Sequence, residues 1–241
     1  MLDSFLAPQY QQWMWQALLV TLSISAISIV LATVLGLFLA GLRNSQIGFV
    51  RIVTVLSCSL FRDTPLLLQI LFWYFAAPQL LPSALMAWLN SAHAFSLFGV
   101  SIGWPSFEFI AGCTALTLYS AVFIAEDIRS GIRGVERGQH DAAMALGMTN
   151  VQGMRFIILP QAWRLARPAL FGQYMHVVKN SSLTMAIGVA ELSYASRQIE
   201  TETLKAFAAY GVATLLYIGI NALINAWDAL LQQRQQPLRG Y

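Results

Sequence analysis

Long apolar runs alternate with short arginine-containing segments along the 241 residues of this chain. A helix needs about 20 apolar residues to cross the hydrocarbon core of a bilayer, and five runs approach that length. The pattern predicts five membrane-spanning helices, at residues 18–42, 52–75, 109–125, 169–190 and 207–231. The run from Pro82 to Pro105 is also apolar, but Asn90, His93 and two glycines interrupt it. We expect a partly helical loop outside the cytoplasm there.

The composition supports an all-α integral membrane protein. Hydrophobic residues make up 57% of the chain, charged residues 10%, and the mean hydropathy is +0.61, whereas soluble domains carry roughly a quarter charged residues. We therefore expect a single transmembrane domain over residues 1–241. No cleaved signal sequence is expected, because Asp3 is the only charge before Arg43. Cys58 and Cys113 lie in apolar runs without metal-ligand spacing, and we expect both to be small buried residues.

The arginines predict the orientation of the spans. Five spans place ten arginines on one side, which the positive-inside rule makes cytoplasmic: Arg43, Arg51, Arg129, Arg133, Arg137, Arg155, Arg164, Arg167, Arg234 and Arg239. The opposite segments carry only Arg197 and Lys205, balanced by three glutamates. The N-terminus is therefore expected outside and the C-terminus in the cytoplasm. The net charge of +3 does not indicate nucleic acid, because the arginines lie between spans rather than along one face.

One cytoplasmic segment, residues 137–160, has an ordered pattern. Helix-favouring residues precede Gly147, which can adopt the left-handed conformation that ends a helix. The sequence predicts a short helix, a glycine stop and a second helical segment that ends at Pro160. Ala142, Ala143 and Ala145 offer a slim surface that another protein can approach. The segment either docks a partner or merely connects two spans.

Two polar motifs interrupt predicted spans. In the second span, Arg62-Asp63-Thr64-Pro65 is followed by Gln69. A charged pair inside a bilayer is costly unless it is paired or faces water, and Pro65 disfavours helix at Thr64. The break either lines a translocation path or is an ion pair at the membrane surface.

The second motif, Lys179-Asn180-Ser181-Ser182, lies in the fourth span. Lys179 either attracts a carboxylate or pairs with a polar neighbour across a dimer.

Three further patterns are interpreted as structural. Glu126 and Arg129 are three residues apart, so they can pair on one helix face. Ala32, Gly36 and Ala40 form a stripe of small residues that permits close helix packing. Polar residues at 221, 225 and 228 share one face of the last span and are also interpreted as packing features.

Several function classes find no support. No Gly-Lys pair occurs, so the chain lacks a phosphate-binding P-loop, and neither H-E-x-x-H nor G-x-S-x-G is present. We expect a chain that is not an enzyme and that holds no metal or cofactor of its own. If ATP drives this protein, magnesium-bound ATP must be hydrolysed in a separate ATPase subunit.

The motifs together resemble a known family. Residues 141–160 match the cytoplasmic pattern E-A-A-x3-G-x9-I-x-L-P of ABC-importer permeases, with Asp141 in place of glutamate. Residues 61–69 are similar to F-R-G-T-P-L-L-V-Q, with Asp63 at the usual small residue. Residues 179–183 resemble K-(N/D)-(T/S)-S-L, and residues 125–129 resemble A-E-x-x-R. From Ala17 to the end of the fifth span, the chain resembles permease subunits of bacterial polar amino-acid ABC importers, most closely the glutamate/aspartate type.

This resemblance implies a type I ABC importer transmembrane domain in the bacterial inner membrane. Two permease subunits, identical or related, pack around a path, and an extracytoplasmic binding protein delivers the amino acid. Two ATPase subunits each receive a loop like 137–160. The implied ATPase-coupling residues are Asp141, Ala142, Ala143, Gly147, Ile157, Leu159 and Pro160. The candidate pathway residues are Arg62, Asp63, Thr64, Gln69, Lys179, Asn180, Ser181 and Ser182.

Two alternatives come from other classes. An ATP-independent secondary transporter or channel subunit predicts an internal repeat or several intramembrane carboxylates, and neither is found. A purely structural membrane-assembly protein does not need polar groups such as Arg62, Lys179 and Ser182 within its spans.

Overall fold

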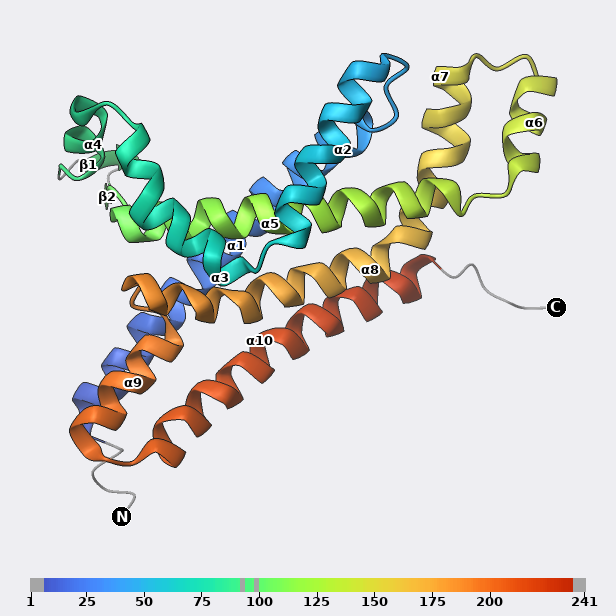
Figure 1. Ribbon diagram of the computed structural model, residues 1–241. Coiled ribbons are helices and arrows are strands. Elements are labelled where there is room, and N and C mark those ends of the chain that lie inside the picture. The colour runs from blue at the N-terminus through green and yellow to red at the C-terminus, as the bar shows by residue number, and fades with distance from the viewer. Residues whose placement is uncertain (1–6, 92–93, 98–99, 236–241) are drawn as a thin grey trace. The chain divides into compact units, whose positions relative to one another are not determined.

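The computed structural model describes residues 7–91, 94–97 and 100–235 (Figure 1). Asp3, His93 and Arg239, used in the predictions above, lie outside these residues. The α-helices are α1 (Pro8–Leu42), α2 (Gly48–Asp63), α3 (Leu66–Leu71), α4 (Ser83–Leu89), α5 (Phe107–Arg133), α6 (Arg137–Ala145), α7 (Asn150–Gly153), α8 (Leu159–Asn180), α9 (Leu192–Thr203) and α10 (Ala206–Gln235). Two π-helical turns, η1 (Phe72–Ala76) and η3 (Met154–Ile158), and two 3₁₀ helices, η2 (Ala77–Leu80) and η4 (Ser181–Ile187), join them.

Three helices in the described part of the chain are long and apolar enough to cross a membrane, namely α1, α5 and α10. They contain the apolar runs 18–42, 109–125 and 207–231. The broken pair formed by α2 and residues 66–80 could supply a fourth span. The count of five spans and their orientation stay predictions.

The second predicted span is not one helix. It breaks between α2 and α3, where Pro65 has extended backbone angles (φ −60°, ψ 134°) and precedes the first turn of α3. Proline removes a backbone donor and disfavours helix at the residue before it, here Thr64. The Gln69 amide closes the break by donating to the Thr64 hydroxyl (2.8 Å) and carbonyl (3.2 Å). The predicted break therefore lies where the sequence placed it.

The fourth predicted span also differs from a single helix. The α-helix begins earlier, at Leu159, and ends at Asn180, after which residues 181–187 form a 3₁₀ helix. Gly188, with φ of 92°, ends that segment in the left-handed region that glycine tolerates best. Hydroxyl side chains such as Ser181 bond to nearby carbonyls and so compete with regular α-helical geometry.

The loop at 82–105 is partly helical, with α4 in its first half, and it also holds a feature that the sequence did not predict. Strands β1 (Ala94–Leu97) and β2 (Val100–Gly103) form an antiparallel hairpin in which Ala94 pairs with Gly103 and Leu97 with Val100.

The described chain divides into two compact units, and α1, α5 and α10 each contribute to both. The first unit holds residues 7–28, 63–118 and 177–217 within the described ranges. In it, Ile24, Leu116 and Leu192 are fully buried. Gly112 allows α1, α5 and η4 to approach, since a Cβ at this position would lie 3.0 Å from Thr184 and 3.5 Å from Ile24.

The second unit holds residues 29–62, 119–176 and 218–235. Its core joins α1, α5 and α8 through buried residues, listed as Ala32, Ala121, Ile124, Ala166 and Leu170. A Cβ at Gly36 would lie 2.7 Å from Ile124, and one at Gly131 would lie 2.6 Å from the Ala166 Cβ. Ala32 and Ala40 are buried. The small-residue stripe of α1 is thus confirmed as a packing feature. Cys58 and Cys113 are confirmed as buried, free thiols.

Candidate functional site

The segment 137–160 forms a helical hairpin in which α6 and α7 contact each other (Figure 1). Gly147, with φ of 78°, ends α6. The Gly147 N–H donates to the Met144 carbonyl (2.9 Å), and the Met148 N–H donates to the Ala143 carbonyl (3.1 Å). These two bonds form a Schellman motif, which satisfies carbonyls that a helix end would otherwise leave unpaired. The predicted glycine stop is confirmed.

The second arm of the hairpin starts with a capping box. The Gln152 N–H donates to the Thr149 hydroxyl, and the Thr149 N–H donates to the Gln152 side chain (2.9 Å). The arm does not end at Pro160, as the sequence predicted, because α8 continues to Asn180. Proline has no N–H and its ring crowds the carbonyl four residues earlier. The preceding turn widens to a π-helix, in which the Leu159 N–H bonds to the Met154 carbonyl.

Two contacts hold the arms together. Ala143 is buried, and a Cβ at Gly153 would lie 3.3 Å from it. The Gln161 amide donates to the Gln139 side chain (3.1 Å), which ties α8 to α6. Ala143, predicted on the docking surface, therefore packs inside the hairpin instead.

The base of the hairpin is anchored in the second unit by an apolar cluster. Val135, Ile158 and Ala162 are buried there, with Ile132, Met154 and Ile157 packed against them. Ile157 therefore also packs inward, although the family pattern placed it among the coupling residues. The hairpin is attached to the ends of both α5 and α8.

Large apolar side chains nevertheless face outward on the hairpin. Leu146 is 77% exposed and Val151 is 76% exposed, and Met144, Phe156 and Leu159 are also exposed. We call these five residues the docking surface. Val151 and Leu159 line a shallow groove together with Asn150, Met154 and Arg155. Asp141, Ala142 and Pro160 are exposed beside it. Exposed apolar groups of this density are typical of an interaction site.

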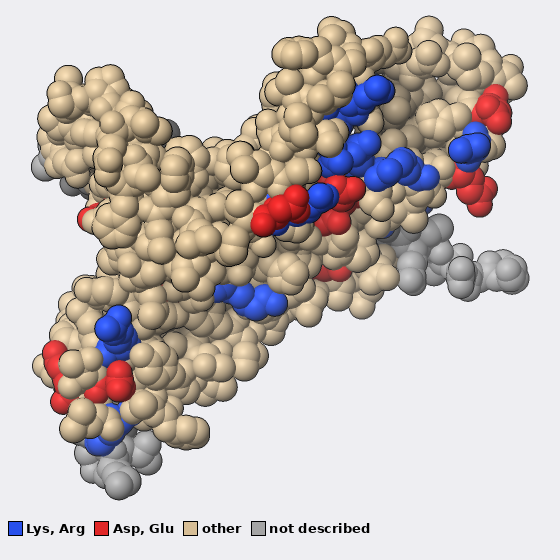
Figure 2. All heavy atoms as spheres, in the orientation of Figure 1, with Lys and Arg blue, Asp and Glu red and all other residues tan. Residues whose placement is uncertain are grey.

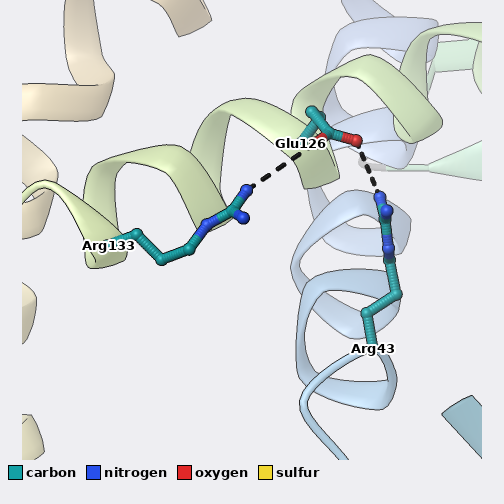
Figure 3. A network of polar contacts seen from close by, with 3 residues as sticks. All are labelled: Arg43, Glu126 and Arg133. Carbon is teal, nitrogen blue, oxygen red and sulfur yellow. Dashed lines mark hydrogen bonds and ion pairs between the residues drawn. The ribbon is translucent and has the colours of Figure 1, made fainter.

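Charged groups gather in a few places on the face drawn in Figure 2, over α9 in one unit and over α2, α5 and α6 in the other. One network in the second unit joins α5 to the residue that follows α1 (Figure 3). An Arg43 terminal nitrogen lies 2.8 Å from one Glu126 oxygen, and an Arg133 terminal nitrogen lies 3.7 Å from the other. Glu126 thus pairs with Arg43 and Arg133 rather than with Arg129, the partner that sequence spacing predicted.

Parts of the two polar motifs approach each other in the first unit, because α3, which carries Gln69, packs against η4, which begins at Ser181. Gln69 is buried and, with Thr64, stabilises the helix break. Arg62 and Asp63 end α2 and are exposed.

The residues of the second motif differ among themselves. Ser181 is buried and donates to the Val178 carbonyl (2.8 Å), and Ser182 donates to the Lys179 carbonyl (2.7 Å). Lys179 is exposed, and Asn180 is half-buried. The hydroxyls of Ser181 and Ser182 therefore bond to their own helix, while Lys179 offers its ammonium group at the surface of the unit.

The sequence analysis did not single out two buried ionisable residues, Glu191 and Arg167. Glu191 is fully buried. It accepts from the Tyr194 N–H (2.9 Å), which caps α9, and from the Tyr217 hydroxyl of α10. In the second unit, Arg167 of α8 lies 2.8 Å from Asp228 of α10. The sequence analysis gave no signal for Glu191, and for the second pair it recognised only the polar face of the last span that includes Asp228.

No group of three or more His, Cys, Asp or Glu side chains gathers to hold a metal ion among the residues that the structure describes.

The chain resembles curated proteins over most of its length. It is 29% identical to the glutamate/aspartate import permease protein GltJ of Escherichia coli K12, over 93% of this chain and 88% of that one. It is 31% identical to a probable amino-acid ABC transporter permease protein, PatM, of Vibrio harveyi, over 85% and 83%.

Solved structures show the same fold. The crystal structure of an amino acid ABC transporter with histidines matches with a TM-score of 0.76 and 30% identity, over 94% of this chain and 95% of that one. The inward-facing MetNI methionine ABC transporter matches with a TM-score of 0.73, covering 96% of this chain, and at 17% identity it supports the fold alone.

A family pattern described as the inner membrane component of binding-protein-dependent transport systems matches residues 32–237, which include the hairpin and both polar motifs. This match covers most of the chain. The chain therefore belongs to that family of inner membrane components, and within it to the amino-acid ABC transporter permeases.

Proposed function

We propose that this permease moves a polar amino acid inward and that separate ATPase subunits drive it through the hairpin at 137–160. The observation that carries this proposal is the docking surface. Its five apolar side chains are exposed on a hairpin whose backbone groups are capped on both sides of the turn between α6 and α7. An apolar partner surface placed against Leu146 and Val151 would remove them from water, which is favourable in proportion to the area buried.

The contacts within the hairpin would let it transmit a displacement of the docking surface to α5 and α8. The Schellman motif at Gly147, the capping box at Thr149 and the Gln139–Gln161 hydrogen bond fix its shape. The buried cluster around Ile158 fixes its base to α5 and α8. A displacement of the docking surface would therefore move the ends of two long helices rather than bend a loop. Magnesium-bound ATP would be held and hydrolysed by the partner subunits.

The substrate class follows from the relatives and from one side chain. The curated relatives include permeases named for glutamate and aspartate and for glutamine. Lys179 is exposed beside the helix end at Asn180. Its ammonium can attract the carboxylate that every amino acid carries, so it favours amino acids without selecting among them. We propose that a binding protein outside the membrane makes the selection, and that a second permease subunit completes the path.

Co-purification with the cognate ATPase subunit tests the docking step. Leu146→Arg and Val151→Arg place a charge at the two most exposed positions of the docking surface. We expect either change to reduce the recovered ATPase by about tenfold or more, because buried apolar anchors dominate interface energies. Ile47→Arg is the matched control, since Ile47 is also exposed and precedes α2. Equal recovery with all three variants would overturn the docking role.

A further inference from the structure

The group of charged side chains around Glu126 has a net positive charge. Glu126 supplies one carboxylate, while Arg43 and Arg133 pair with it and Arg129 lies within electrostatic range of all three. We call Arg43, Arg129 and Arg133 the basic cluster. The neighbouring carboxylate, Asp127, accepts a hydrogen bond from Gln173 (3.1 Å) and does not join it. Three guanidinium groups and one carboxylate therefore lie near one another, and two of the three guanidinium groups pair with that carboxylate.

The donors of the basic cluster are not all used. Arg43 is nearly enclosed, with 12% of its side chain exposed, and its Nε finds no hydrogen-bond acceptor among the described residues. The buried Nε of Arg129 likewise has no acceptor in the described part of the chain. Arg133, in contrast, is 63% exposed and reaches Glu126 only at 3.7 Å. The enclosed Nε atoms are out of reach of an external acceptor, so the exposed Arg133 guanidinium, held only loosely by Glu126, is the group that an added acceptor would engage first.

The predicted third span, residues 109–125, would place the basic cluster at the depth of lipid headgroups. Arg43 directly follows the 35-residue helix α1. About 20 residues of α5, from Phe107 to Glu126, make about 30 Å of helix, which equals the thickness of the hydrocarbon core. The last two turns of α5, with Arg129 and Arg133, therefore extend beyond the core. Residues 126, 129 and 133 share one face of α5 because they are three and seven positions apart.

We propose that the basic cluster binds the phosphate of an anionic phospholipid headgroup. Phosphate oxygens accept several hydrogen bonds at once, and the planar guanidinium is suited to donate to them. Arg129 and Arg133 would engage the phosphate, and Glu126 would hold Arg43 in place beside it. The proposal concerns only residues of this chain at the membrane surface, so it does not depend on the docking of an ATPase.

Retention of phosphatidylglycerol by the purified chain tests this site. Native mass spectrometry of the detergent-solubilised protein, with phosphatidylglycerol titrated against phosphatidylcholine, gives an apparent affinity for each lipid. The variant Arg129→Gln/Arg133→Gln keeps the Arg43–Glu126 pair. Each arginine at an anionic membrane surface strengthens binding roughly fivefold, so we expect this variant to lose about 30-fold in affinity for phosphatidylglycerol and nothing for phosphatidylcholine.

A charge-matched control separates the site from general attraction. Arg51→Gln/Arg164→Gln removes two exposed arginines that make no ion pair in the described part of the chain. This control should retain wild-type affinity. A second variant, Glu126→Gln, removes the competing negative charge while its amide oxygen still accepts from Arg43, and it should bind phosphatidylglycerol several-fold more tightly.

Three results would overturn the proposal. The first is an equal loss of affinity in the control pair, which would mean unspecific attraction. The second is unchanged phosphatidylglycerol binding in the Arg129/Arg133 variant, provided that it elutes as a monodisperse species like the wild type. The third is displacement of phosphatidylglycerol by an excess of inorganic phosphate, which would make free phosphate the ligand rather than a lipid.

Discussion

Removing one partner of the ion pair between Arg167 and Asp228 should be one of the most destabilising single changes in the second unit. The two side chains are 4% and 18% exposed, and their charged atoms lie 2.8 Å apart. Removing one partner of a buried pair leaves the other charge without compensation, which costs roughly 3–5 kcal/mol. We therefore expect Arg167→Met and Asp228→Leu each to destabilise the protein by this amount.

The expected change in melting temperature follows from the size of the chain. One kcal/mol shifts the midpoint by about 2–4 °C for a domain of 150–250 residues, so each single variant should melt about 6–20 °C below the wild type. The double variant Arg167→Met/Asp228→Leu leaves no unpaired charge, and apolar replacements of a buried pair are often neutral or stabilising. It should recover most of the loss.

Thermal unfolding of the detergent-solubilised protein measures these shifts. Because membrane proteins often unfold irreversibly, all variants have to be compared at one scan rate. Arg164→Met is the control, since Arg164 is exposed on the same helix. The reasoning would be refuted if the single variants melted with the control, or if the double variant melted at the sum of the single losses.

Two further predictions concern glycines. Gly131→Val should strongly reduce the yield of folded protein, because its Cβ would lie 2.6 Å from the Ala166 Cβ and 2.7 Å from the Ala162 carbonyl oxygen. Gly138→Val is the control and should fold, because a Cβ at Gly138 meets nothing within 4 Å. Size-exclusion profiles of the two variants test this difference. Gly147→Asp should fold, since its Cβ meets no atom within 4 Å and the left-handed backbone costs about 1–2 kcal/mol. Once this variant is assembled with the ATPase subunits, those subunits should hydrolyse ATP without transport. Wild-type uptake by that variant would contradict its place beside the docking surface.

Local backbone chemistry was predictable from the sequence. Gly147 ends α6 because glycine adopts a positive φ at little cost, and this preference does not depend on tertiary contacts. Pro65 breaks the second apolar run for a similarly local reason. The stripe at Ala32, Gly36 and Ala40 was recognisable because small residues four apart share one helix face.

The residues that contact one another between helices were not predictable from the sequence, because these contacts depend on which helices meet. Glu126 has an arginine three residues away on its own helix, yet its hydrogen-bonded partner is Arg43, which is 83 residues distant. Ala143 belongs to the family pattern, but the pattern does not say that the residue faces α7. Pro160 was expected to end a helix. A wider π-helical turn precedes it instead and allows the helix to continue, and single-residue helix propensities do not predict such a turn.

Uptake of labelled amino acid into proteoliposomes tests the central claim most directly. The vesicles would contain this permease with its ATPase subunits, and the binding protein with its amino acid would be added on the extracytoplasmic side. The account predicts uptake that requires ATP on the ATPase side, that falls by about tenfold or more in Leu146→Arg, and that persists in Ile47→Arg. Uptake at the wild-type rate without ATP, or unchanged ATP-driven uptake in Leu146→Arg, would contradict it.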